Sequence, residues 1–110
     1  MCKRTLLIDL DGVLNEYSGN YNPNFIPTIK SGAFNFLKKM YSKYDLKIFT
    51  TRNSQLTEKW LVDNKINHFV NGVTNQKIPA WLIIDDRCIT FSGNYDVLVE
   101  KIDTFKPWYK

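Results

Sequence analysis

Short, wholly apolar runs alternate with helical patterns along this sequence, and this alternation limits the fold more than any other feature. Residues 6–8 contain no polar position, as expected of a strand that is buried on both faces, and residues 81–84 form another continuous apolar run. Between these runs, apolar residues recur at spacings of three and four, the period of an amphipathic helix. Strands that alternate with helices form parallel sheets. We therefore predict an α/β protein with a parallel sheet.

The pattern places all 110 residues in a single domain, residues 1–110. Residues 12–28 are rich in Asn, Gly and Pro, so we expect a loop or small flap there. We predict strands at 5–8, 46–49, 66–70 and 81–84, of which 66–70 is the weakest. We predict one helix from 28 or 31 to 43 and another around 56–64. A last helix is expected to bury a stripe formed by Tyr95, Leu98, Val99, Ile102 and Phe105.

Composition narrows the class of partner and the compartment. Lys and Arg number 15 and Asp and Glu 11, and the net charge of +4 suits an anionic substrate without requiring nucleic acid. The first apolar run stops at Asp9, too early for a signal peptide, and no run elsewhere is long enough to span a membrane. Cys2 and Cys88 lie far apart, so we favour two free thiols over a disulfide. These features predict a cytoplasmic protein.

Polar residues directly follow three of the predicted strands. Asp9 ends the first strand, Thr50 the second and Asp85 the fourth. In an open parallel sheet the loops after the carboxyl ends of the strands converge, and ligands bind there. We therefore expect these three residues to lie close together at one edge of the sheet.

Asp9 and Asp11 are two carboxylates separated by one residue, directly after the first strand. Two like charges in a small volume are unfavourable unless a cation or a shared proton relieves them. Mg²⁺, which binds one or two carboxylates together with a phosphate, is the natural relief. Gly12 allows the sharp turn that follows. An EF-hand calcium loop is excluded, because the positions that require Gly and Glu hold Leu14 and Asn20.

Three further positions carry candidate groups, each with a plainer alternative. The Thr50 hydroxyl lies between a strand end and a helix start, where it can donate to a phosphate oxygen, although Thr50 or Asn53 could instead cap the helix. Lys77 is a lone loop lysine, and such side chains are usually solvated. Asp85 and Asp86 follow a continuous apolar strand, where solvated acids are rare.

The order of these groups resembles the haloacid dehalogenase-like (HAD-like) hydrolase superfamily, in particular its small phosphatase-like members: Asp9-Leu10-Asp11-Gly12, then Thr50, Lys77 and Asp85-Asp86. The resemblance covers nearly the whole chain. It implies a three-layer, Rossmann-like parallel sheet with helices on both faces. It also implies a Mg²⁺-dependent phosphohydrolase, a phosphomonoesterase that acts through an aspartyl-phosphate.

The resemblance assigns roles residue by residue. Asp9 would be the nucleophile, and Asp11 would protonate the leaving oxygen and then take a proton from water. Thr50 would hold a phosphoryl oxygen, and Lys77 would neutralise charge. The Mg²⁺ ligands would all be oxygens: the carboxylate of Asp9, the backbone carbonyl of Asp11 and the carboxylate of Asp86. Asp85 would lie behind them.

Some of these assignments stay open at this point. Thr51 is an alternative to Thr50, and Lys65 is a weaker substitute for the loop lysine. Either of the two adjacent acids could be the direct metal ligand. Arg52 and Arg87 flank the motifs and could contact substrate, although a structural role is more common for such residues.

Residues 12–28 are too few for the cap domain that many members of this superfamily carry. We therefore expect a cap-less protein with an open site. An open site suits large phosphorylated substrates, including nucleic-acid ends, whereas a small phosphate would need closure by a second copy in a homo-oligomer. Tyr17 and Tyr21 in the flap, and the aromatic residues of the C-terminus, could stack on nucleic acid, but packing roles are more common for them.

Two other classes of function compete with an active phosphatase. A phosphate-accepting receiver module also combines acids, Thr, Lys and Mg²⁺, but its acidic pair comes first in the chain, whereas here the adjacent pair comes last. A catalytically silent relative would bind metal, phosphate or a partner protein. Since every catalytic residue type is present, we favour the enzyme.

Overall fold

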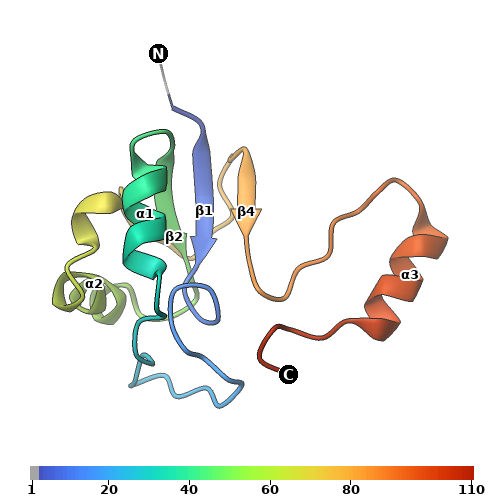
Figure 1. Ribbon diagram of the computed structural model, residues 1–110, viewed down its shortest axis with the longest axis horizontal. Coiled ribbons are helices and arrows are strands. Elements are labelled where there is room, and N and C mark those ends of the chain that lie inside the picture. The colour runs from blue at the N-terminus through green and yellow to red at the C-terminus, as the bar shows by residue number, and fades with distance from the viewer. Residues whose placement is uncertain (1–2) are drawn as a thin grey trace.

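The fold is built on one parallel sheet. The computed structural model describes residues 3–110, so Cys2 lies outside the described residues. Every neighbouring pair of strands is parallel in the order β3-β2-β1-β4, where the strands are β1 (Thr5–Asp9), β2 (Asp45–Phe49), β3 (Val73–Thr74) and β4 (Leu82–Ile84). The predicted α/β class with a parallel sheet is confirmed (Figure 1).

Two helices, α1 (Ala33–Tyr41) and α2 (Ser54–Asp63), cover one face of this sheet. α1 joins β1 to β2 and α2 joins β2 to β3, so both connections advance toward the same edge of the sheet. Because such crossovers are right-handed, both helices lie on the same face. Within residues 3–110, no helix is long and apolar enough to cross a membrane. The buried side chains of the helices and of the two central strands form one apolar cluster that includes Leu6, Ile8, Leu46, Ile48, Ala33, Leu37 and Leu61.

One predicted strand and the predicted start of one helix are wrong. In place of a strand at 66–70, the structure has the 3₁₀ turn η1 (Asn67–Phe69), and β3 lies further along the chain. Ile66 and Phe69, three residues apart, are both buried in the core, which suits a helical turn rather than an alternating strand. α1 begins later than expected, because Gly32 before it has a φ of 91°, a left-handed conformation outside the helical range.

The last helix, α3 (Tyr95–Thr104), also differs from expectation. No residue of α3 is buried, and the predicted buried stripe is open, with Tyr95 74% and Ile102 57% exposed. Figure 1 shows α3 apart from the sheet, at the end of a long irregular segment. The radius of gyration is 14.8 Å, above the roughly 13 Å expected of a compact chain of this length. The apolar period identifies an amphipathic face but not what that face packs against.

Backbone contacts join the two ends of the irregular segment at 12–28. Lys30 N donates to Leu14 O at 2.8 Å, and Asn15 and Ile29 form an isolated antiparallel bridge. These contacts bring both ends of the segment together beside the carboxyl end of β1. The segment therefore borders the edge of the sheet where the polar strand ends lie.

Candidate active site

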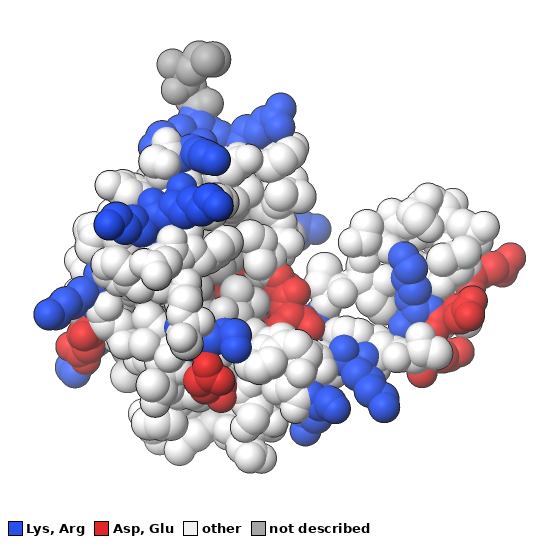
Figure 2. Space-filling view, in the orientation of Figure 1, with Lys and Arg blue, Asp and Glu red and all other residues white. Residues whose placement is uncertain are grey.

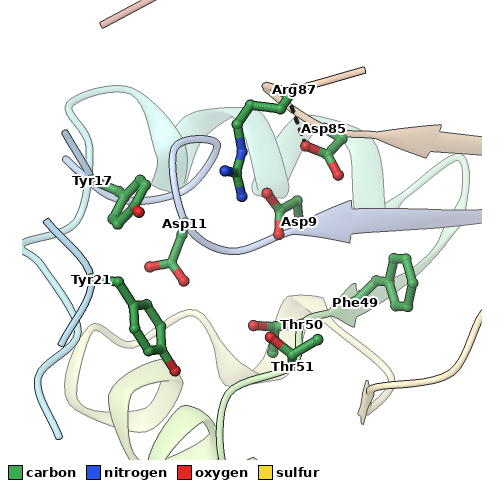
Figure 3. Close-up of a pocket in the computed structure, with 9 residues that line it drawn as sticks. All are labelled: Asp9, Asp11, Tyr17, Tyr21, Phe49, Thr50, Thr51, Asp85 and Arg87. Carbon is green, nitrogen blue, oxygen red and sulfur yellow. Dashed lines mark hydrogen bonds between the residues drawn. The ribbon is translucent and has the colours of Figure 1, made fainter. Parts of the chain in front are cut away.

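The carboxyl ends of β1, β2 and β4 bring the predicted residues together. β1 pairs with β2 up to Asp9 and Phe49, and with β4 up to the residue before Asp9. Thr50 and Asp85, which follow β2 and β4, therefore lie beside Asp9. A cavity of about 240 Å³ opens there, and Figure 3 shows its lining residues: Asp9, Asp11, Tyr17, Tyr21, Phe49, Thr50, Thr51, Asp85 and Arg87.

Asp9, Asp85 and Asp86 form an acidic cluster at this edge. One carboxylate oxygen of each lies within 4.8 Å of the others. Burial, reinforced by the charge of Asp85 and by the carboxyl of Asp86, raises the pKa of Asp9 from its usual 3.8 to about 8. Burial, with Asp85 nearby, also raises the pKa of Asp86. Figure 2 shows acidic side chains in a hollow between the body of the molecule and its C-terminal part. This crowding favours a bound cation.

Asp86 lies against the turn that follows β1. Gly12 has a φ of 83°, and a Cβ at this position would collide with the Asp86 carboxylate. Both Asp86 oxygens are buried without a hydrogen-bond partner in the described part of the chain. Unpartnered buried carboxylate oxygens are costly, and a hard cation with oxygen ligands would satisfy them. The donor set therefore fits a divalent cation such as Mg²⁺.

Asn15 organises the same turn, a role that the sequence analysis missed. Its fully buried side chain accepts hydrogen bonds from the backbone N–H groups of Gly12 and Tyr17, both at 3.1 Å. Its Nδ2 donates to Asp11 Oδ1 at 3.0 Å. In the sequence, Asn15 is a polar residue directly after two apolar ones, four positions beyond Asp11. That pattern was the available signal, because an amide buried there needs local hydrogen-bond partners.

Arg52 lies behind Asp11 and does not line the cavity. Its Nε donates to Asp11 Oδ2 at 2.7 Å and its Nη1 donates to Asn22 O at 2.8 Å. Its guanidinium carbon lies 4.7 Å from the centre of the Tyr21 ring. Arg52 therefore orients the Asp11 carboxylate and ties the irregular segment to the end of β2.

The remaining candidates divide between the cavity and the surface. Arg87 is the one Lys or Arg residue that lines the cavity in the described part of the chain, and Figure 3 shows its side chain among the lining residues. Lys77 is exposed on the connection between β3 and β4 and does not line the cavity. Thr51 lines it together with Thr50, so either hydroxyl can meet a ligand there. Asn53 caps α2 by accepting from Leu56 N at 3.0 Å, one of the plainer alternatives above.

No protein-family model matches this sequence, and no curated protein matches it. The fold itself recurs in a solved structure. That structure, described as a conserved protein coded by a locus from Bacteroides thetaiotaomicron, is similar with a TM-score of 0.61 and 19% identity, over 92% of this chain and 90% of that chain. At this identity the likeness shows the fold alone, and it agrees with the parallel α/β architecture.

Proposed function

We propose that this chain is a Mg²⁺-dependent phosphomonoesterase of the HAD-like superfamily that acts through an aspartyl-phosphate at Asp9. The main supporting observation is that Asp9, Asp85 and Asp86 converge beside a cavity that Asp11 and Thr50 also line. A nucleophile, an acid–base group, a hydroxyl donor and cation ligands are the groups that this kind of phosphoryl transfer requires.

The proposed reaction has two displacements at phosphorus. In the first, an oxygen of Asp9 attacks in line, the P–O bond to the alcohol breaks, and Asp11 gives its proton to the leaving oxygen. In the second, Asp11 takes a proton from water, and the water oxygen attacks the phosphorus. The bond to Asp9 then breaks, which releases inorganic phosphate and restores the free carboxylate.

Asp9, Asp86 and the backbone carbonyl of Asp11 would hold the Mg²⁺, with Asp85 beside them. The bound ion supplies positive charge that lets the crowded acids ionise together and neutralises the phosphate oxygens. Burial and the neighbouring acids raise the pKa of Asp9, so a cation bound beside it favours the ionised, nucleophilic form. The proposal therefore requires the cation before Asp9 can attack.

Thr50 and Arg87 are proposed to meet the phosphate. Both line the cavity that holds the acids, and donors placed where charge develops contribute strongly to catalysis. Lys77 is exposed on the connection between β3 and β4 and does not line this cavity. In our proposal Arg87 therefore takes the role that the family resemblance assigns to Lys77.

The substrate class is a phosphomonoester, small or polymeric. Tyr21 is 53% exposed at the cavity lining, where it would contact the part of the substrate beyond the phosphate. Cys88 is an exposed free thiol, which suits the reducing cytoplasm as the proposed compartment.

A catalytically silent relative that binds a cation or a partner is the second candidate. The observation that favours it concerns Asp11, whose two carboxylate oxygens are engaged by Asn15 and Arg52. An acid held in this way must still exchange a proton with the leaving group. The exposed position of Lys77 points in the same direction.

Hydrolysis of p-nitrophenyl phosphate with and without Mg²⁺ tests the proposal. The wild type should turn over only with the ion, and Asp9→Asn should abolish turnover because it removes the nucleophilic carboxylate. Asp63→Asn removes an exposed carboxylate on α2 and should keep full activity. Equal turnover in Asp9→Asn and wild type would exclude Asp9 as the nucleophile. Mg²⁺ binding without turnover on a broad panel of phosphomonoesters would favour the silent relative.

A further inference from the structure

The C-terminal tail, residues 105–110, returns to the acidic cluster after α3. Figure 1 shows the end of the chain beside the irregular segment at 12–28, although α3 itself stands apart. Because no residue of α3 is buried, packing of that helix does not account for where the tail lies. The tail is held by its own contacts.

Trp108 contacts the turn on which the metal site depends. Its indole Nε1 donates to Gly12 O at 2.6 Å, across 96 positions of sequence. Lys30 Nζ lies 4.0 Å from the centre of the Trp108 ring and supports it from the other end of the irregular segment. Gly12 is the residue whose Cα faces the Asp86 carboxylate. Trp108 therefore restrains the peptide that sets the position of Asp86.

Tyr109 continues the contact. Its ring packs edge-on against the ring of Tyr17, with centroids 5.7 Å apart, and Tyr17 is itself a buried residue of the cavity lining. Two adjacent tail residues therefore contact this edge of the sheet, Trp108 at Gly12 and Tyr109 at Tyr17.

We propose that Trp108 and Tyr109 are positioning residues for the cation site: Trp108 restrains Gly12 against Asp86, and Tyr109 holds the tail against Tyr17, so that the three acids converge on the ion. The acids repel one another before the ion binds, so contacts that prevent Asp86 from moving away favour binding. Groups that orient metal ligands from outside affect affinity about 10- to 100-fold when they are removed. This inference rests on the cation-binding part of the proposed function.

Mg²⁺ titration calorimetry on the full chain tests the inference without measuring turnover. Trp108→Phe keeps an aromatic ring but loses the donor to Gly12, and it should bind Mg²⁺ about tenfold more weakly than wild type. Tyr109→Leu loses the ring that packs on Tyr17 and should weaken binding by a smaller factor. The control is Trp81→Phe, because Trp81 stacks on Tyr44 before the start of β4, at the opposite end of that strand from the acids. Its Mg²⁺ affinity should equal that of wild type.

Urea unfolding of the same variants without Mg²⁺ shows whether each variant is folded, so that weaker Mg²⁺ binding by a folded variant reports positioning rather than loss of structure. If Trp108→Phe and Tyr109→Leu are folded and bind Mg²⁺ within twofold of wild type, the inference is overturned while the proposed function stands. A wild type that binds no Mg²⁺ overturns both. Should Trp108→Phe fail to fold, Tyr109→Leu decides, since Tyr109 lies outside the buried core and near the end of the chain.

Discussion

Arg52 and Asp11 form an ion pair that joins the end of β2 to the turn after β1, with 2.7 Å between Nε and Oδ2. The Arg52 side chain is only 1% exposed and that of Asp11 16%, so water screens the pair poorly. Removing one partner of such a pair leaves the other charge without compensation. The pair is therefore a structural link as well as a means of orienting Asp11.

Replacing Arg52 with Met should lower the free energy of unfolding by about 3 kcal/mol, because it leaves Asp11 without its buried partner. Urea denaturation measures this. Lys59→Met is the matched control: its pair with Asp63 has side chains 75% and 58% exposed, so its loss should cost less than about 0.5 kcal/mol. Equal effects of the two substitutions would contradict the buried pair.

Without metal, the protein should lose stability as the pH rises through the acidic and neutral range. The pKa of Asp9 is about 8 when folded against 3.8 ordinarily, so the unfolded chain releases this proton first. The stabilising contribution of protonated Asp9 is complete below about pH 4 and is lost as the pH approaches 8. The raised pKa of Asp86 acts in the same direction.

Urea unfolding in EDTA across this pH range measures the effect. Asp9→Asn should reduce the fall in stability, since the amide does not titrate. Saturating Mg²⁺ should also reduce it, because the cation stabilises the ionised acids. Parallel stability curves for wild type and Asp9→Asn would show that Asp9 does not titrate in the way the geometry implies.

Gly12→Ala should destabilise the protein and weaken Mg²⁺ binding. The added Cβ is strained at a φ of 83° and collides with the Asp86 carboxylate. Gly32→Ala separates these two causes, because Gly32 has a similar φ of 91° with no atom within 4 Å of the added Cβ. We expect Gly32→Ala to cost about 1 kcal/mol of stability with unchanged Mg²⁺ affinity. Matching Mg²⁺ affinities in the two variants would argue against contact between Gly12 and Asp86.

Ile102→Ser should change the free energy of unfolding by less than about 0.5 kcal/mol, because Ile102 is 57% exposed on a helix without buried residues. Leu37→Ala, at a fully buried position of α1, should cost about 2–5 kcal/mol. Thermal or urea unfolding compares the two. A loss at Ile102 as large as that at Leu37 would mean that the α3 stripe is packed, as the sequence pattern predicts.

The pattern of apolar and polar residues was enough to predict the parallel sheet and the place where its polar groups meet. Residues 6–8 are apolar at every position, which favours a strand covered on both faces, and all three are buried, whereas Leu82 in the equally apolar run 81–84 is 47% exposed. The carboxyl ends of parallel strands share one edge whatever the loops do. For that reason the meeting of Asp9, Thr50 and Asp85 could be predicted before any tertiary contact was known.

The contacts that complete that edge form between distant parts of the folded chain. Arg52 contacts Asp11 across 41 positions, and Trp108 contacts Gly12 across 96. Such pairs leave no periodic pattern in the sequence, because they depend on the paths of loops and on the directions of single side chains. The same reason explains why Arg87 rather than Lys77 lines the cavity, and why the apolar stripe of α3 could be recognised without revealing whether it packs on the sheet.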